Sequence, residues 1–313
     1  MILEKNKYNI IFIGTPEFSV PTLKSLIADE RFSVCAVITA PDAKVGRKQI
    51  LTPPPVKVEA EKHDIKILQP KDIKDVINDI DEMKPDAIVT IAYGQILPEK
   101  ILNIPKHGCL NLHASLLPKY RGASPIQTAI ANGEGETGAT LMKMDKGMDT
   151  GDIIAQEKIK IEKEETGESL HDKLAGLSAA AAVKYIPQYL DGALKPKPQD
   201  KQQATYAPKL TRNNGKIDWN KSAEEIERLI RAFHPWPGTW CKWNNKTLKI
   251  IAVFNIKKIN KYEPGTVFLH DNKLTVQCGK NAIIIKELQL EGKNKMSGQE
   301  FLAGHKEIIN IQL

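Results

Sequence analysis

The chain has 313 residues, of which 41% are hydrophobic and 27% charged, and its formal net charge is +7. This length accommodates two domains, and no apolar run reaches the roughly 18 residues that a membrane-spanning helix needs. The four cysteines are scattered without a Cys-x-x-Cys pair, so neither a disulfide framework nor a zinc site is expected. Residues 1–9 do not resemble a secretory signal, and we therefore expect a cytoplasmic protein.

The first 190 residues alternate between strand and helix patterns. Strands are predicted at 9–13, 33–39, 65–68, 87–90, 109–112 and 139–144. Helices are predicted at 18–28, 56–62, 72–83 and 170–190. Such alternation is typical of an α/β fold, in which a mostly parallel sheet carries helices on both faces.

Residues 191–208 are polar, contain three prolines and show no apolar period, so they are predicted to be a linker. Beyond them, Ser222 and Glu225 have the spacing of a capping box and start a helix over 222–232. Short strands then follow, separated by turn residues, at 248–254, 265–269, 273–277 and 282–290. This spacing predicts a small β-barrel domain over 209–313.

The C-terminal third is the basic part of the chain. Residues 201–313 hold 16 lysines and three arginines against ten acidic residues, a net charge of +9. This excess favours a polyanionic partner. The alternative is a lysine-rich surface without a specific partner, and the spacing of the lysines does not decide between the two.

A candidate catalytic site follows the strand at 109–112. Asn111 and His113 are two positions apart, so they project from the same face of the strand. Asp149 lies in a Gly-rich turn farther along the chain. An amide, an imidazole and a carboxylate suit acyl transfer, in which an oxyanion forms and a proton moves. The alternatives are a core histidine and a turn-forming aspartate.

Common cofactor motifs are missing from the sequence. Residues 133–138 match G-x-G-x-x-G, but a strand rather than a helix is predicted after them, so we interpret them as a turn. There is no phosphate-binding G-x-x-x-x-G-K-[ST] loop, and no histidine spacing indicates a metal site.

Three further segments have open interpretations. The long loop 41–57 carries Lys44, Arg47 and Lys48 and is either a basic finger for a nucleic-acid backbone or a solvated insertion. Residues 91–94 follow a buried strand and are either a simple strand-to-loop transition or, if that strand is parallel, the wall of a ligand crevice. The Trp- and Pro-rich segment 231–240 is either a structural junction or a surface on which an unpaired base stacks.

Together these segments resemble the methionyl-tRNA formyltransferase family over nearly the whole chain. The resemblance is carried by FIGTP at 12–16, AYGQILP at 92–98, NLHASLLP at 111–118, RGASPIQ at 121–127, MDTGD at 148–152 and RAFHPWP at 231–237. One position departs from the family pattern. Ala43 stands where the tRNA-acting branch usually has an arginine, and Lys44 and Arg47 are the candidates to replace it.

The resemblance implies a Rossmann-like formyltransferase catalytic domain over 1–190 and an OB-fold-like, tRNA-binding barrel over 209–313. It implies transfer of a formyl group from 10-formyltetrahydrofolate to the α-amino group of methionine on initiator methionyl-tRNA, which serves translation initiation. It also implies a monomer with neither a metal nor a membrane partner. The residues it assigns to catalysis are Asn111, His113 and Asp149. Those it assigns to the folate are Ala92, Tyr93, Gly94, Ser115, Leu116, Leu117 and Pro118. Those it assigns to tRNA are Lys44, Arg47 and Lys48.

In these roles, Asn111 would donate to the developing oxyanion, His113 would donate to it when protonated, and Asp149 would pass on the proton of the amine. Three other functions remain in competition. A formyltransferase for a small amine would keep the same three residues but would have little use for a basic barrel domain. A formyltetrahydrofolate hydrolase would use water as the acceptor, and an inactive RNA-binding protein would not need the three residues together.

Overall fold

The computed structural model describes residues 7–46 and 48–313, which form two compact units. The first unit contains the described residues up to Pro125 together with Glu136–Lys160 and His171–Ala207. The second contains Ile126–Gly135, Ile161–Leu170 and Pro208–Leu313. No described helix is both long enough and apolar enough to cross a membrane.

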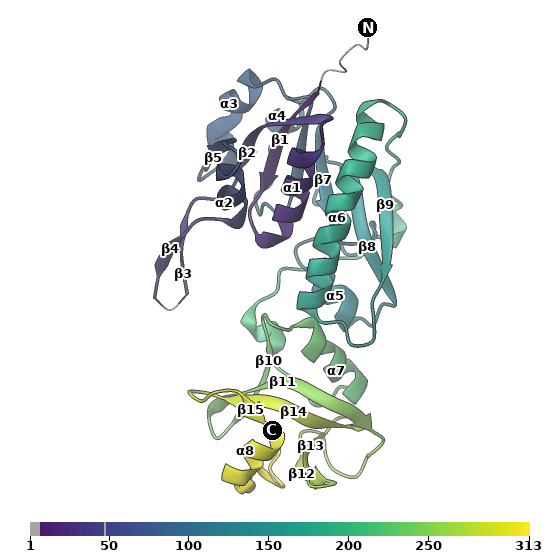
Figure 1. Ribbon diagram of the computed structural model, residues 1–313. Helices are drawn as coiled ribbons and strands as arrows, with labels where there is room; N and C mark the ends of the chain where they lie inside the picture. Colours follow the sequence, from purple (N-terminus) through teal and green to yellow (C-terminus); the bar gives the residue numbers. More distant parts are fainter. Residues whose placement is uncertain (1–6, 47) are drawn as a thin grey trace. The chain divides into compact units, whose positions relative to one another are not determined.

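The first unit is built on a seven-stranded sheet with the strand order β5-β2-β1-β6-β7-β8-β9 (Figure 1). These strands are β1 (Tyr8–Gly14), β2 (Phe32–Ile38), β5 (Lys66–Leu68), β6 (Ala87–Ile91), β7 (Cys109–His113), β8 (Glu136–Lys143) and β9 (Ile153–Lys160). The first five pair in parallel, whereas β8 is antiparallel to both of its neighbours. The predicted α/β fold with a mostly parallel sheet is confirmed.

Helices cover both faces of this sheet. Ile11, Ile13 and Ile88 pack in one cluster with residues of α3 (Ile77–Glu82) and α4 (Glu99–Leu102). Figure 1 shows α1 (Val20–Ala28) and α6 (Gly167–Leu190) over the opposite face. A buried parallel sheet of this kind explains the continuous apolar runs of its central strands. A further helix of this unit is α2 (Pro55–Glu61), whereas all but the first residue of α5 (Pro125–Ala131) belongs to the second unit.

Some elements differ from the sequence prediction. Strand β9, helices α4 and α5, and a hairpin of β3 (Ala43–Val45) and β4 (Ile50–Thr52) were not predicted. Gly133 lies in a turn with φ +74°, and a strand follows as predicted, but the turn is shorter than predicted because β8 already begins at Glu136. The predicted helix over 72–83 is divided into a 3₁₀ turn at Ile73–Val76 and helix α3.

The predicted linker differs as well, because residues 191–207 pack within the first unit. Lys197 exchanges two backbone hydrogen bonds with Ile153 of β9. The Arg121 N–H donates to the Thr205 carbonyl, and the Arg121 carbonyl accepts from the Ala207 N–H. The polar, proline-rich composition of the segment therefore reflects a chain that is extended along the sheet unit. A C-terminal domain that starts at 209 remains a prediction.

The second unit contains an antiparallel sheet with the order β10-β11-β14-β13-β12, and β15 also pairs with β14. Its strands are β10 (Thr239–Trp243), β11 (Lys246–Lys257), β12 (Val267–His270), β13 (Lys273–Gln277), β14 (Ala282–Leu290) and β15 (Met296–Ser297). Helices α7 (Ala223–Ala232) and α8 (Gly298–Gly304) supply Ile226, Ile230 and Phe301 to its core. The predicted β-rich C-terminal part is confirmed, and its sheet is antiparallel; closure into an OB-fold-like barrel remains a prediction.

The start of α7 follows the sequence prediction. Ser222 Oγ accepts a hydrogen bond from the Glu225 backbone N–H at 3.2 Å, and Glu225 Oε2 accepts one from the Ser222 N–H at 2.9 Å. In the Trp- and Pro-rich segment that follows, Trp240 Nε1 donates to the Arg212 carbonyl at 3.0 Å. Arg231 bonds both Glu227 and the Glu165 carbonyl. These contacts favour the structural interpretation of this junction.

Candidate active site

Asn111 and His113 lie at the carboxyl end of β7, where the parallel part of the sheet ends. Thr90 of the parallel neighbour β6 is the register partner of Asn111, so the ends of the two strands lie side by side. Asn111 is half-buried, and no hydrogen bond of its side chain is present among the described residues. Its amide is therefore available as a donor and an acceptor at the edge where open α/β sheets bind ligands.

His113 is buried, at 7% exposure, and both ring nitrogens have neighbours. Nε2 lies 2.9 Å from the Tyr120 carbonyl oxygen, which can only accept, so Nε2 carries the proton of this hydrogen bond. Nδ1 then faces Asp149, whose Oδ1 lies 3.6 Å away. In the neutral ring Nδ1 keeps a lone pair, and in the charged ring it holds a proton directed towards a carboxylate.

Asp149 is held by its backbone as well as by its side chain. Its φ of +53° is the left-handed conformation that aspartate tolerates better than most residues. Oδ2 accepts a hydrogen bond from the Gly122 N–H at 2.8 Å, and Gln199 Nε2 donates to the Asp149 carbonyl at 2.9 Å. One carboxylate oxygen is thus fixed by the backbone, and the other remains directed towards His113.

Gln199 and Arg121 support this turn and were not predicted from the sequence. Gln199 Nε2 also donates to the Gly151 carbonyl at 2.7 Å, and its Oε1 accepts from Arg121 Nη2 at 2.6 Å. Both side chains are buried. Arg121 lies in the motif RGASPIQ but was given no role of its own. Gln199 lies in the segment predicted as a linker and had no signal in the sequence.

Gly122 is the glycine that this geometry requires. Its φ is +112°, and a Cβ atom at this position would lie 2.6 Å from the Ala207 carbonyl oxygen. A side chain is excluded both by the backbone conformation and by the close approach. The N–H that holds Asp149 therefore depends on glycine at this position.

The segments expected at the folate lie next to these residues. After β6, Ala92 has φ +51° and Gly94 has φ +89°, so the chain bends sharply at the same edge of the sheet. Tyr93 is 8% exposed, and its hydroxyl is a buried polar atom without a hydrogen-bond partner among the described residues. Burial, with a smaller contribution from the charge of Asp72, raises the pKa of Tyr93 to about 12, so the hydroxyl stays a neutral donor.

The segment Ser115–Pro118 is held by hydrogen bonds from side chains of β8 and β9. Thr140 Oγ1 donates to the Ser115 carbonyl at 2.6 Å and accepts from the Leu117 N–H at 3.1 Å. Gln156 Nε2 donates to the Leu117 carbonyl at 2.9 Å. These backbone groups are already bonded within the protein, so this segment offers a ligand a rigid wall rather than free hydrogen-bonding groups.

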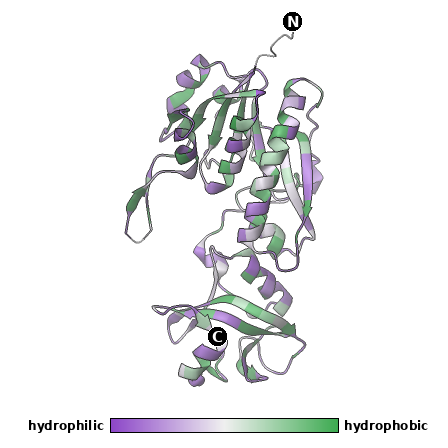
Figure 2. Cartoon of the chain, viewed as in Figure 1, coloured by the Kyte–Doolittle hydropathy of each residue, from purple (hydrophilic) through white to green (hydrophobic). Residues whose placement is uncertain are grey.

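The predicted basic loop contains the β3–β4 hairpin, which Figure 1 shows extending from the body of the first unit. Lys44 and Lys48 are exposed on it, and Arg47 lies outside the described residues. Apolar side chains are exposed as well, with Val45 at 55% and Leu51 at 63%. Figure 2 shows the apolar character of these strands. A hairpin with both cations and exposed apolar groups is suited to a partner outside the chain.

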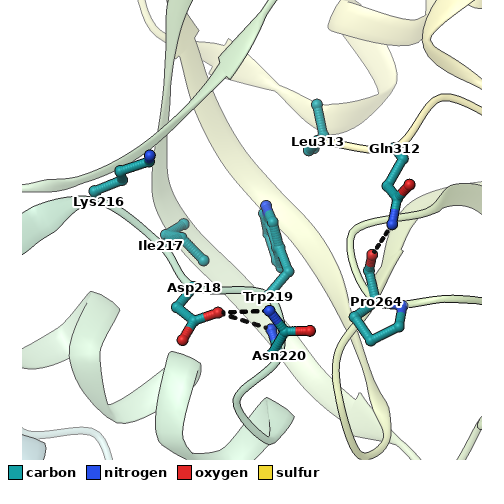
Figure 3. A pocket seen from close by; sticks show the side chains of 8 residues that line it. All are labelled: Lys216, Ile217, Asp218, Trp219, Asn220, Pro264, Gln312 and Leu313. Carbon is teal, nitrogen blue, oxygen red and sulfur yellow. Dashed lines mark hydrogen bonds between the residues drawn. The ribbon is translucent and has the colours of Figure 1, made fainter.

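Two cavities lie away from this cluster. One, of about 370 Å³ in the second unit, is lined by Lys216, Ile217, Asp218, Trp219, Asn220, Pro264, Gln312 and Leu313 (Figure 3). The other, of about 500 Å³ in the first unit, is lined by residues that include Lys143–Lys146, just before the Asp149 turn. Neither is lined by Asn111, His113 or Asp149. Within the described residues, no group of three His, Cys, Asp or Glu side chains is arranged to hold a metal ion.

The structure thus brings Asn111, His113 and Asp149 to one edge of the first unit. It provides an uncommitted amide, an imidazole with one fixed nitrogen and a carboxylate with one fixed oxygen. This set can stabilise negative charge on a carbonyl oxygen and move a proton.

Both parts of the chain match models of known protein families, and close relatives carry one name. The family model described as formyl transferase matches residues 8–186, and that described as formyl transferase, C-terminal domain, matches residues 209–306. The methionyl-tRNA formyltransferase of Halalkalibacterium halodurans is 48% identical over 299 residues, 94% of each chain. That of Caldanaerobacter subterraneus subsp. tengcongensis is 46% identical over 95% of this chain and 96% of the relative.

Solved structures share the fold at lower identity. The N-formyltransferase from Helicobacter canadensis, in complex with folinic acid and dTDP-3-aminofucose, has a TM-score of 0.67 at 21% identity. It matches 90% of this chain and 99% of its own length. HypX from Aquifex aeolicus, in complex with tetrahydrofolic acid, has a TM-score of 0.61 at 18% identity; 96% of this chain matches 47% of HypX. The relatives at 48% and 46% identity confirm the predicted relationship. The chain belongs to the methionyl-tRNA formyltransferase family of formyl transferases.

Proposed function

We propose that this chain transfers the formyl group of 10-formyltetrahydrofolate to the α-amino group of methionine on initiator tRNA. The product, N-formylmethionyl-tRNA, serves translation initiation. The observation that carries the proposal is the Asn111–His113–Asp149 cluster in a chain that aligns over its length with relatives of this name. We further propose that it acts as a monomer in the cytoplasm.

The residues at the sheet edge fit a folate donor. Within the described part of the chain, the Tyr93 hydroxyl is a buried donor without a partner, and Ala92 and Gly94 bend the backbone around the same place. A flat pterin ring needs a few fixed polar groups on an otherwise apolar wall. We propose that Ala92–Gly94 and Ser115–Pro118 form this wall. When bound, the donor supplies an activated one-carbon acyl group.

In the proposed mechanism, Asn111 acts on the formyl oxygen. As the amine attacks, that oxygen gains negative charge, and the Asn111 Nδ2–H donates a hydrogen bond to it. A donor of this kind, placed in advance in a partly buried site, is worth roughly 10²–10³ in rate. Because this amide has no partner among the described residues, no bond to one of them has to break first.

His113 and Asp149 handle the proton that the amine loses. With Nε2–H fixed on Tyr120, Nδ1 of the neutral imidazole is an acceptor. After it takes the proton, the imidazolium faces Asp149 Oδ1 at 3.6 Å. Asp149 can also accept the proton directly or through water. The proton then passes to the folate nitrogen as the tetrahedral centre breaks its C–N bond and tetrahydrofolate leaves. The Gly122 N–H holds the carboxylate, and Gln199 holds the Asp149 backbone carbonyl, throughout.

Lys44, Arg47 and Lys48 are proposed to contact tRNA. Lys44 and Lys48 are exposed on the hairpin, where lysines lose little solvation when they pair with phosphates. The net charge of +9 over residues 201–313 supports a further contribution from the C-terminal part.

The deciding experiment is a formyl-transfer assay with labelled 10-formyltetrahydrofolate. Initiator methionyl-tRNA, elongator methionyl-tRNA and glycinamide ribonucleotide are offered in parallel. Label on the initiator tRNA alone is the expected result. Label on the small amine, or release of formate without an acceptor, would contradict the proposal and leave a different member of the formyl transferase fold.

A further inference from the structure

One buried hydroxyl beside the candidate active site takes no part in the mechanism given above. Thr90, in β6, is 6% exposed, and its Oγ1 has no hydrogen-bond partner among the described residues. Buried hydroxyls normally bond to a protein group, a water or a ligand, and one left without a partner lowers stability. Thr90 therefore has a cost in stability that no contact within the described part of the chain offsets.

The sheet register places Thr90 beside Asn111. The two residues are partners in the parallel β6–β7 pair, so their side chains leave the sheet on the same face. On the other side of β6, the register partner of Thr90 is Ile13, and Ile88 lies two positions earlier on the same face. Both isoleucines are apolar and fully buried. Asn111 is thus the polar neighbour of Thr90 across the two adjacent strands.

Asn111 also has unused hydrogen-bonding capacity. Its amide makes no bond to another described residue, and it carries an acceptor oxygen, Oδ1, as well as the two N–H groups of Nδ2. In the proposed mechanism only Nδ2 acts, because it donates to the formyl oxygen. An amide that turns freely presents either end to that oxygen, and the Oδ1 end repels the negative charge that develops there.

From this geometry we propose that Thr90 is a positioning residue for Asn111. When the folate is bound, the Thr90 hydroxyl donates to Asn111 Oδ1 and holds the amide with Nδ2 directed towards the formyl oxygen. The hydroxyl is the donor because a buried donor without an acceptor is costlier than an unused lone pair. Catalytic hydrogen bonds are often open in the free enzyme and close in the reactive complex. The proposal rests on the proposed function, because it takes Asn111 as the donor to the oxyanion.

The test compares Thr90→Val with Thr39→Val. Thr39 follows β2, which β1 and β6 separate from β7, and its hydroxyl is likewise buried and lacks a described partner. Each change replaces a hydroxyl by a methyl group of similar shape. We expect Thr90→Val to lower kcat about tenfold, a part of what loss of the whole donor removes, with KM for the folate and for tRNA unchanged. Thr90→Ser should retain the wild-type kcat, and Thr39→Val should change none of these values.

A double-variant cycle shows through which group Thr90 acts. In an Asn111→Ala background, Thr90→Val should cause no further loss of kcat. Tyr93 carries another buried hydroxyl that lacks a described partner, and in a Tyr93→Phe background the loss of about tenfold should persist at saturating folate. Losses that multiply with that of Asn111→Ala, a loss that disappears in Tyr93→Phe, or an unchanged kcat in a folded Thr90→Val variant would each overturn the proposal.

A measurement without any acceptor separates this proposal from the proposed function. In the complex with folinic acid, the side-chain amide resonance of Asn111 is assigned by its absence from Asn111→Ala. It should move in Thr90→Val and stay in place in Thr39→Val, and an unmoved resonance in Thr90→Val would contradict the proposal. If the wild-type protein formylates a different amine, the proposed function fails. The comparison of kcat is then made with that amine, because the formyl oxygen gains the same charge.

Discussion

Two turns of the first unit have similar backbone conformations and opposite surroundings. Asp149 has φ +53°, and Gln49, between β3 and β4, has φ +50°. Asp149 is held by the Gly122 N–H and by Gln199, whereas the β3–β4 hairpin pairs with itself and exposes both of its strands. The difference matches the function proposed for each turn. Proton transfer requires atoms fixed to a fraction of an ångström, whereas attraction of a polyanion requires only charges in water.

The largest expected effect is on catalysis at the Asn111–His113–Asp149 cluster. Its absence would contradict the contrast between this cluster and the β3–β4 hairpin. Asn111→Ala should lower kcat by roughly 10²–10³-fold, because the only change is loss of a donor to the charged oxygen. Binding of tRNA, measured by filter retention, should be unchanged. Asn103→Ala, at an exposed helix end, serves as the control. A decrease of less than tenfold would remove Asn111 from the proposed mechanism.

Rigidity of the Asp149 turn is tested through Gly122. Gly122→Ala introduces a Cβ that would lie 2.6 Å from the Ala207 carbonyl, at a φ that alanine avoids. We expect a loss of roughly 1–3 kcal/mol in the free energy of unfolding together with lower kcat. Gly176→Ala in α6, where a Cβ would meet nothing within 4 Å, should be neutral or slightly stabilising. A Gly122→Ala variant with wild-type stability and kcat would show that the turn tolerates movement.

Substitutions in the β3–β4 hairpin should weaken tRNA binding without changing the rate of formyl transfer. Lys44→Ala/Lys48→Ala should raise KM for tRNA several-fold and reduce the salt slope of tRNA binding by up to about two. The value of kcat at saturating tRNA should not change. Lys158→Ala, which removes an exposed cation already paired with Glu136 at 3.0 Å, is the control. A selective fall in kcat would mean that the hairpin also positions the reacting groups.

A smaller effect concerns Tyr93. Its folded-state pKa is raised from 10.0 to about 12, so the folded protein retains a proton that the unfolded chain loses. The corresponding stability is fully present below pH 10 and is lost as the pH rises from 10 to 12. Tyr93→Phe should therefore lose stability less steeply than the wild type over this range in denaturant titrations. The exposed Tyr206, changed to Phe, should leave the slope unchanged.

The last prediction is that alkylation of the cysteines has no effect on formyl transfer. Burial raises the pKa of Cys109, two residues from Asn111, to about 12, and the same holds for Cys241. Their thiols remain protonated and inert at neutral pH. Treatment with iodoacetamide at pH 7.5 should leave formyl transfer intact. Inactivation in proportion to labelling of Cys109 would show that β7 opens in solution.

Much of the fixed site could be predicted because it depends on local patterns. Strand alternation placed Asn111 and His113 on one face, and the Gly-rich turn marked Asp149. The partners of that turn could not be predicted in the same way. Gln199 lies 50 residues from Asp149 and contacts it only after the chain has folded, so no spacing or periodicity identifies it.

The elements that were missed are short or irregular. Strands β3 and β4 have three residues each, too few for an alternation to be recognised. The predicted strand 265–269 begins instead at Val267, because Gly265 has φ +86° and belongs to the preceding turn. The linker prediction relied on composition, which does not distinguish a free segment from one extended along a folded surface.

The position of Gln199 has a practical consequence for dividing this chain. A fragment that ends at residue 190, where the last helix of the sheet unit stops, would retain Asn111, His113 and Asp149. It would nevertheless lack the side chain that holds the Asp149 backbone and the Ala207 carbonyl that accepts from Ser124. Proteolysis within 191–207, or insertion of a fusion partner there, would likewise separate the candidate active site from part of its scaffold. The most linker-like stretch of the sequence is thus a poor place to cut.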